Sequence, residues 1–416
     1  MKPKLLTTIQ DYSSKLFVAD ALAGITVAMV ALPLSIAIAV ASGAQPAAGL
    51  VTAIIGGLLI SALGGSRVQI GGPTGAFIVV VYGVIEQFGF DGLLLATLMA
   101  GVILVVAALA RAGKLIALIP EAVIEGFTIG IALIIAISQL KDLFGLSVAK
   151  LPADFVETVP ALWNARHSAN VLAAAIGLAS IVGIALLRRR AGSIVVIALA
   201  SASVAIFALP VETIHSRFGD LPNGLPYPSL PPISVARVSE LLPSALVIAF
   251  LAGVESLLSA IVADRMVGGA HRSNAELLAQ GAANIASPLF GGLPATGAIA
   301  RTAANVRAGG RTPVAGMVHA IAILIFVVAA APLAGYLAMP ALAALLAVTA
   351  WSMSEPHRWR EHFRARPADR FLLLLTMTLT VISDLTVAIA VGTAVGLAQR
   401  LIRRDVEPAE WTPPDR

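Results

Sequence analysis

Apolar runs of about 20 residues recur along the whole chain, and they constrain its fold more than any other feature. The hydrocarbon core of a bilayer is about 30 Å thick, and a helix of about 20 residues crosses it. Of the 416 residues, 58% are hydrophobic and 12% are charged, whereas about 25% of the residues in soluble domains are charged. We therefore predict an all-α integral membrane protein.

The apolar runs predict fourteen membrane-spanning helices. No polar stretch is long enough to form a separate soluble domain, so residues 1–416 are expected to be a single transmembrane domain. A tight turn at Ser383 and Asp384 is expected between the last two spans. The predicted spans cover residues 16–42, 46–64, 73–88, 92–111, 118–140, 168–187, 192–209, 240–262, 273–290, 296–307, 313–331, 333–350, 369–384 and 386–402.

The distribution of basic residues predicts the orientation of the chain. If both termini are cytosolic, the cytosolic segments hold most of the 28 Lys and Arg residues. Such an excess is typical of the cytosolic loops of membrane proteins. We expect a multi-pass protein of the bacterial inner membrane with both termini in the cytosol. A basic cytosolic face also accounts for the net charge of +5, so no nucleic-acid partner is expected. The opposite loops hold only Lys141, Lys150, Arg166, Arg217 and Arg237.

Several classes of function are excluded or disfavoured by missing residues and motifs. The chain has no cysteine, which excludes disulfides and thiolate metal sites, and its six histidines show no metal-ligand spacing. No metal or other cofactor is therefore expected. An ATP-driven pump is disfavoured because no Gly-x-x-x-x-Gly-Lys-Ser/Thr loop occurs. An enzyme is not expected, because the chain has neither a Gly-x-Ser-x-Gly turn nor a His-Glu-x-x-His pair.

Two short segments in opposite halves of the chain resemble each other. Residues 71–77 read Gly-Gly-Pro-Thr-Gly-Ala-Phe, and residues 291–299 read Gly-Gly-Leu-Pro-Ala-Thr-Gly-Ala-Ile. Thr74 matches Thr296, and seven predicted spans separate the two copies. Because that number is odd, we expect two repeats that are inverted in the membrane.

The glycines and proline of each copy predict an interrupted helix. The chain is expected to enter the membrane extended and to become helical only at Thr-Gly-Ala, giving half-helices over 74–88 and 296–307. Paired interruptions in inverted halves indicate the binding site of a transporter. Two facing helix N-termini offer free N–H groups and positive partial charge, which favours an anion. The alternative is that both segments are kinked helices, with Gly and Pro serving close packing.

Two charged residues lie inside predicted spans near this site. Arg301 follows Thr296 by little more than one helical turn, and a charge at such a depth normally faces a cavity or a partner. It could contact the anion or form a structural ion pair with Glu255 of the eighth span. Glu255 in turn could carry a proton or stay ionised against Arg301, because desolvation and a nearby cation have opposite effects on a carboxylate. The sequence leaves these alternatives open.

Motifs along nearly the whole chain resemble those of the sulfate permease (SulP) family of anion transporters and exchangers. Their order and spacing carry the resemblance more than any single motif does. The matching segments are 20–28 (DALAGITVA), 32–37 (LPLSIA), 46–50 (PAAGL), 71–76 (GGPTGA), 120–127 (PEAVIEGF) with Gly130 and Gln139, 254–256 (VES), 294–298 (PATGA), 301–303 (RTA) and Asn305.

The resemblance implies two inverted seven-span repeats, divided into a core (16–112 and 240–332) and a gate (113–209 and 333–404). In this family the core moves against the gate in an elevator-like manner, and homodimers are common. Glu255 is then the candidate coupling residue. The substrate would lie between the third and tenth spans and be bound by Pro33, Leu34, Thr74, Gly75, Ala76, Phe77, Thr296, Gly297, Ala298, Ala300 and Arg301.

The chain also departs from the family pattern. Leu34 and Ala300 stand where relatives often have Gln and Ser, which makes this part of the pocket less polar and puts sulfate in doubt. Relatives usually continue into a cytosolic STAS domain. We expect this domain to be absent here, with residues 405–416 as a linker stump.

The leading hypothesis is secondary active transport of a small anion. The candidate substrates are a dicarboxylate such as fumarate or succinate, bicarbonate and sulfate, and proton coupling is an option. One alternative is a passive anion channel lined by the same broken helices. Another is a nucleobase carrier on a related fold, but such a carrier is expected to have a carboxylate in the tenth span, where this chain has Arg301.

Overall fold

A computed structural model of the chain describes residues 2–114, 120–148, 151–187, 192–383 and 385–402. Its contacts divide the chain into two compact units, and each of them is described by itself. The first unit falls within Met1–Ile116 and Asp220–Gly335, and the second within Ala117–Gly219 and Tyr336–Thr412. The predicted linker stump at 405–416 and Asp384 of the predicted tight turn lie outside the described residues.

The first unit is built of helices from both halves of the chain. It also contains a π-helical turn, Thr52–Gly56, and three short 3₁₀ turns, Ile9–Asp11, Gly75–Phe77 and Ala112–Lys114. Its helices are α1 (Lys4–Thr8), α2 (Ser14–Ala41), α3 (Pro46–Val51), α4 (Gly57–Leu63), α5 (Ile78–Leu109), α12 (Val235–Val267), α13 (Ser273–Leu289), α14 (Ile299–Arg307) and α15 (Pro313–Gly335).

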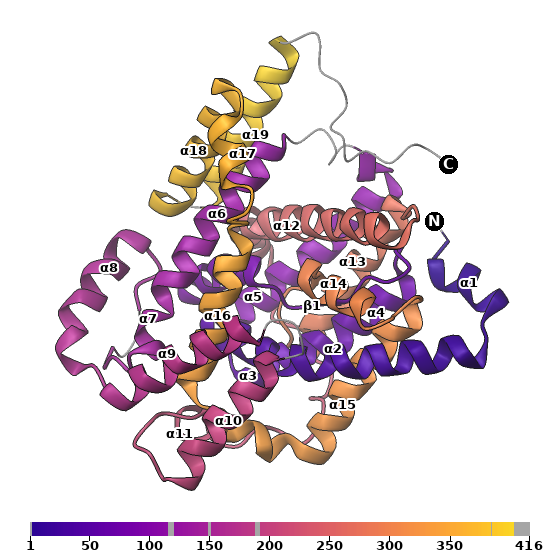
Figure 1. Ribbon diagram of the computed structural model, residues 1–416. Helices are drawn as coiled ribbons and strands as arrows, with labels where there is room; N and C mark the ends of the chain where they lie inside the picture. Colours follow the sequence, from indigo (N-terminus) through magenta and orange to yellow (C-terminus); the bar gives the residue numbers. More distant parts are fainter. Residues whose placement is uncertain (1, 115–119, 149–150, 188–191, 384, 403–416) are drawn as a thin grey trace. The chain divides into compact units, whose positions relative to one another are not determined.

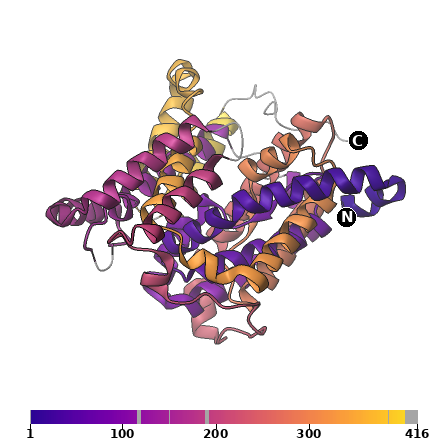
Figure 2. The same ribbon diagram turned by 60° about the horizontal axis from the view of Figure 1, so that its bottom comes forward.

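Helices from opposite halves of the sequence pack in pairs within this unit. Helix α2 lies along α15, and α5 lies along α13 (Figures 1 and 2). Small residues permit the close approach, as is usual between helices in membranes. A Cβ atom at Gly24 would collide with the carbonyl oxygen of Ala315, and one at Gly101 would lie 2.7 Å from the backbone nitrogen of Ile285. The two halves of the sequence are therefore interleaved.

A two-residue antiparallel ladder lies inside the first unit. Strand β1 (Gly71–Gly72) pairs with β2 (Thr296–Gly297), with Gly71 opposite Gly297 and Gly72 opposite Thr296. All four residues are buried. The pairing satisfies backbone groups that an extended chain would otherwise leave unbonded in the membrane.

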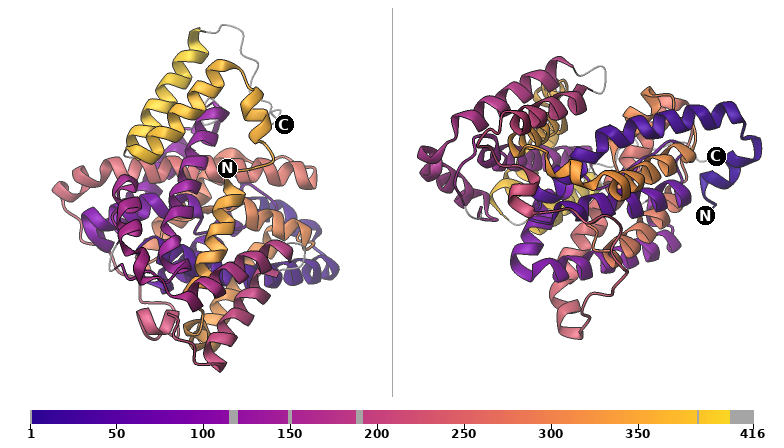
Figure 3. Two further views of the ribbon diagram at one scale, coloured as in Figure 1. Left: turned by 60° about the vertical axis from the view of Figure 1, so that its left-hand side comes forward. Right: turned by 90° about the horizontal axis from the view of Figure 1, so that it is seen from below.

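The second unit contains shorter helices. Helix α18 packs against α6 and α19, and α16 packs against α9; Figure 3 shows α18 and α19 side by side in its left panel. The helices are α6 (Glu121–Ser138), α7 (Leu140–Leu143), α8 (Phe155–Asn164), α9 (Val171–Leu186), α10 (Gly192–Ile206), α11 (Ile214–Phe218), α16 (Met339–Met353), α17 (Trp359–Arg364), α18 (Pro367–Ile382) and α19 (Leu385–Ile402).

Six of the described helical segments are each long and apolar enough to cross a membrane, and a bent pair, Phe155–Ser168 with Val171–Leu186, could add a seventh crossing. One of the six, Gly75–Leu109, contains two predicted spans. A kink at Gly89, which has a φ of 73° and a ψ of 177°, divides it. Glycine adopts this conformation without steric cost.

Several predicted boundaries were wrong. Helix α12 begins at Val235 instead of residue 240, because the N-cap Ser234 accepts a hydrogen bond from Arg237 N. Helix α15 continues to Gly335, past Pro332, with a kink at Ala330. The next helix therefore starts at Met339 instead of residue 333. Helix α8, which is capped by Asp154, was not predicted.

Candidate functional site

The β1–β2 ladder places two helix N-termini close to each other. After β1 the backbone is still extended at Thr74 (φ −126°, ψ 157°) and turns helical at Gly75. After β2 it is extended at Ala298 (φ −99°, ψ 113°) and turns helical at Ile299. Because the two strands are antiparallel, α5 and α14 leave the ladder in opposite directions, with their N-termini nearest to it.

The first N–H groups of both helices have no acceptor within their own helix. In α14 the first bond of the helix runs from Thr302 N to the carbonyl oxygen of Ala298, at 2.9 Å. The N–H groups of Ile299, Ala300 and Arg301 come before this bond. At the other N-terminus the first bond runs from Phe77 N to Thr74 O, and the N–H groups of Gly75 and Ala76 come before it. Such groups, together with the helix dipole, favour a negatively charged ligand.

The two repeated threonines both contact α12. Thr74 Oγ1 donates a hydrogen bond of 2.8 Å to Glu255 Oε2, and Thr296 Oγ1 donates one of 3.0 Å to the carbonyl oxygen of Ala252. Glu255 therefore belongs to the site through the first half-helix. The two copies differ, because only the first reaches a carboxylate.

Arg301 is 4% exposed and lies in the first turn of α14. Its Nη2 donates a 3.1 Å hydrogen bond to Ser35 Oγ of α2, whereas its Nη1 is buried without a hydrogen-bond partner. Nη1 lies against Gly72 of β1, where a Cβ atom would collide with it. A buried cationic nitrogen without a partner is costly unless a ligand or water satisfies it.

The sequence left open whether Arg301 and Glu255 form an ion pair. In the described structure each makes a different hydrogen bond, to Ser35 and Thr74 respectively, and no ion pair joins the two side chains. Neither side chain is therefore held by direct contact with the other. The contact between Arg301 and Ser35 was not predicted, because nothing in the sequence around a single serine in an apolar helix indicates which residue it will bind.

The other predicted site residues differ in exposure. Pro33 is buried and Leu34 is half-buried, two residues and one residue before Ser35 in α2. Gly75, Phe77, Gly297 and Ala298 are buried, and Ala76 is half-buried. Ala300 is exposed. All of these residues except Pro33 and Leu34 belong to the ladder or to the start of one of the two half-helices.

Sequence reasoning also missed a polar face on α13. Glu276, Gln280, Asn284 and Ser287 are all fully buried. Their spacing of three or four residues marks one face of a helix. A polar face on a predicted span indicates a buried network, so this spacing was a usable signal.

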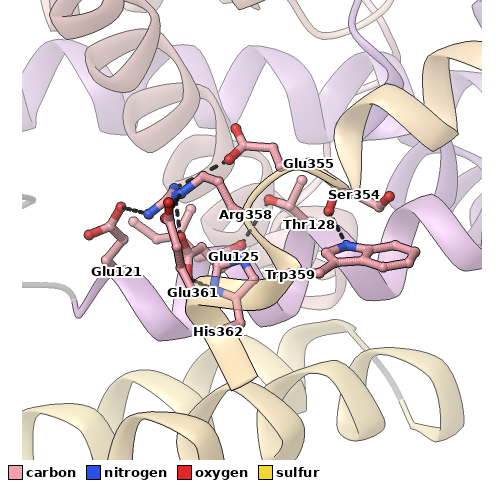
Figure 4. Close-up of polar contacts among 10 residues, drawn as sticks. Glu121, Glu125, Thr128, Ser354, Glu355, Arg358, Trp359, Glu361 and His362 are labelled. Atoms are coloured by element: carbon pink, nitrogen blue, oxygen red, sulfur yellow. Dashed lines mark hydrogen bonds and ion pairs between the residues drawn. The ribbon is translucent and has the colours of Figure 1, made fainter. Parts of the chain in front are cut away.

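The second unit carries a different polar cluster, at the N-terminus of α6 (Figure 4). Arg358 Nη2 lies 3.0 Å from Glu121 Oε1, and Nη1 lies 2.7 Å from Glu125 Oε1. Burial opposes the charge of Arg358, but Glu125 and Glu121 outweigh it and raise the pKa of the guanidinium. His362 Nδ1 lies 3.2 Å from Glu125 Oε2. The cluster links α6 to the connection between α16 and α17 by ion pairs. Because it contains more carboxylates than cations, it would repel an anion.

Comparisons with known proteins agree with this geometry. The sulfate permease family matches residues 17–376. The "Putative sulfate transporter YvdB" of Bacillus subtilis (strain 168) is 42% identical over 92% of this chain and 73% of its own length. The "Bicarbonate transporter BicA" of Picosynechococcus sp. is 31% identical over 90% of this chain and 68% of its own.

A solved structure has the same fold. The transmembrane domain of a cyanobacterial bicarbonate transporter, BicA, superposes with a TM-score of 0.81 at 28% identity, covering 92% of this chain and 98% of that domain. The predicted fold class is thereby confirmed: an all-α integral membrane protein of two inverted seven-span repeats, with interrupted third and tenth spans.

Proposed function

Because this chain belongs to the sulfate permease family of membrane anion transporters, we propose that it binds a small anion between the N-termini of α5 and α14 and carries it across the bilayer. The relatives are named as transporters and not as enzymes. The proposed substrate-binding groups are the first-turn N–H groups of the two helices and Arg301, with Thr74 beside them. Pro33 and Leu34 complete the proposed pocket on α2.

The unpartnered Nη1 of Arg301 carries this proposal. It is buried next to β1, in the first turn of a helix whose first N–H groups have no acceptor within that helix. A bound anion would accept hydrogen bonds from both kinds of donor. Bonds between charged groups are about twice as strong as neutral ones. Glu255 opposes the binding of an anion unless its carboxylate is neutralised, which is the basis for proposing proton coupling.

The proposed substrates are bicarbonate, sulfate and small dicarboxylates such as fumarate and succinate. The names of the relatives supply the first two. Leu34 and the exposed Ala300 are the basis for the third, because their apolar side chains offer no hydrogen bond to an anion but can contact a carbon chain between two carboxylates. The two compact units suit an elevator-like motion, in which the first unit carries the anion and the second stays in place.

The proposed setting is the bacterial inner membrane, with both termini in the cytosol. The basic residues support this orientation. A homodimer is proposed on the resemblance to the family alone.

A radiotracer panel tests the proposal. Purified protein in liposomes would be offered labelled sulfate, bicarbonate, chloride, succinate and fumarate, with and without an inward proton gradient. Saturable uptake of one or more of these anions is expected, and protein-free liposomes are the control. No saturable uptake of any of the five would contradict the proposal. Steady unitary currents in a planar bilayer would instead show a channel.

A further inference from the structure

Glu276 is a buried carboxylate of the first unit, and the site described above does not use it. It lies on α13 and is fully buried. Its Oε2 accepts hydrogen bonds from the backbone nitrogens of Gly65, at 2.8 Å, and Ser66, at 3.2 Å. Its Oε1 accepts from Ser256 Oγ and from Gln280 Nε2, each at 2.9 Å.

All four partners of Glu276 are donors. The backbone nitrogens and the amide nitrogen of Gln280 can only donate. The Ser256 hydroxyl already accepts from Gln69 Nε2, at 3.0 Å, and from Gln280 Nε2, at 2.6 Å, so its own proton goes to Glu276. Only a group that accepts at both oxygens satisfies this arrangement, and an ionised carboxylate is such a group.

The turn held by Glu276 leads directly to the first half-helix. Gly65 and Ser66 are followed by residues 67–70, which have no regular secondary structure, and then by β1 and Thr74. The backbone of this segment is fixed at further points by side chains: Asn305 Nδ2 donates to Val68 O at 2.8 Å, and Ile70 N donates to Thr302 Oγ1 at 3.1 Å.

The segment is also fixed to α12. Gln69 Nε2 donates to Ser256, both to its carbonyl oxygen at 3.1 Å and to its hydroxyl at 3.0 Å. Ser256 directly follows Glu255, which binds Thr74. The same stretch of α12 therefore contacts the first half-helix through Glu255 and the preceding segment through Ser256. Glu276 binds both Ser256 and the start of that segment, at Gly65 and Ser66.

We propose that Glu276 is a positioning residue for the anion site. Its carboxylate fixes the turn at Gly65 and Ser66 and so sets where β1 and the N-terminus of the first half-helix present their N–H groups. The role of the site in anion binding rests on the function proposed above, but the position of the half-helix can be measured without transport.

The test uses the absence of cysteine from the chain. Ala76→Cys and Ala300→Cys each introduce a single thiol at the start of one half-helix, and the rate of its reaction with a small methanethiosulfonate reagent reports how accessible that N-terminus is. Glu276→Gln places an amide NH₂ against donors, which leaves buried groups unsatisfied. We expect it to change the labelling rate at position 76 about tenfold, and to change the rate at position 300 by a clearly smaller factor.

Controls separate this role from a general loss of structure. Glu276→Asp keeps a carboxylate and is expected to restore part of the wild-type rate. Glu240→Gln removes an exposed carboxylate of α12 and should change neither rate. If Glu276→Gln does not fold, Ser256→Ala, which removes one donor, is expected to shift the rate at position 76 in the same direction by a smaller factor.

Two results would overturn the proposal: equal rates in wild type and Glu276→Gln at position 76, or equal changes at positions 76 and 300. In transport assays Glu276→Gln is expected to raise KM about tenfold with a smaller effect on kcat. Absence of transport by the wild type would defeat the proposed function, while the labelling result would still decide the role of Glu276.

Discussion

Gly72 and Arg301 lie in direct contact across the centre of the first unit, although they come from opposite halves of the chain. Nη1 of Arg301 rests against the Cα of Gly72, where a side chain would collide with it. Gly72 also has a φ of 152°, a backbone conformation that residues with a side chain rarely adopt. Because Gly72 in the first copy of the repeat has no side chain, the guanidinium of Arg301, next to the second copy, can lie against it.

Gly72→Ala is therefore expected to displace the guanidinium and weaken anion binding. The added methyl group would collide with the buried guanidinium of Arg301. In addition, alanine is strained at the φ of this position. We expect KM for tracer uptake to rise at least about tenfold. Gly83→Ala is the matched control, because a Cβ atom there meets nothing within 4 Å. Wild-type uptake by Gly72→Ala would mean that the contact has no role in binding.

Arg301→Gln tests the cation itself. The variant keeps a donor for Ser35 but loses the charge and the second nitrogen. Uptake of a doubly charged anion is expected to fall about a hundredfold, since hydrogen bonds to charged groups contribute about 1.5–3 kcal/mol. Arg307→Gln, at the exposed end of the same helix, should transport normally. Equal kinetics in Arg301→Gln and wild type would remove Arg301 from the site.

The repeat allowed much of this centre to be predicted from the sequence. Gly71 to Ala76 and Pro294 to Ala298 identified both interruptions because glycine and proline act locally on the backbone. The pairing of Gly72 with Thr296 could not be predicted, since it depends on how distant segments fold together. The Ser35 partner of Arg301 was missed for the same reason.

Glu255→Gln tests proton coupling. Gln keeps a carbonyl oxygen that can accept the hydrogen bond from Thr74, so the fold should persist. It cannot bind and release a proton, however. We expect an inward proton gradient to accelerate uptake by the wild type and to have no effect on the variant. Indifference of the wild type to the gradient would rule out coupling, and a gradient-dependent variant would assign it to another residue.

Tyr12→Phe tests a contact near the N-terminus. Burial, and then the charge of Asp20, raise the pKa of Tyr12 to about 12, and its hydroxyl donates a 3.1 Å hydrogen bond to Asp20 Oδ2. The folded state thus holds the phenol proton more tightly than the unfolded state, whose pKa is about 10. This stabilisation is complete below pH 10 and is lost as the pH rises toward 12.

Thermal unfolding in detergent measures this effect. Below pH 10 the variant should be less stable than the wild type by about 1 kcal/mol, and the difference should shrink as the pH rises from 10 to 12. Tyr227→Phe, at a side chain that is 95% exposed, is the control. A difference that stays constant across this range would contradict the assignment.

Helix boundaries and buried polar contacts were predicted less well. The sequence pattern ended one span at residue 331, but α15 continues through Pro332 to Gly335, since a proline near the end of a helix removes few of its hydrogen bonds. The role of Glu276 could not be inferred because its partners, Gly65 and Ser66, lie far away in the sequence. Local patterns predicted the helices and their interruptions, whereas tertiary structure determined the polar contacts.

Locating the bound anion would show directly whether it lies between the two half-helices. A cryo-electron microscopy map would be recorded with the anion that gives the highest uptake in the tracer panel, and again without it. We predict anion-dependent density within hydrogen-bonding distance of Arg301 Nη1 and of the first N–H groups of both half-helices. Density bound elsewhere, or a map in which residues 71–88 and 291–307 form uninterrupted or widely separated helices, would contradict it.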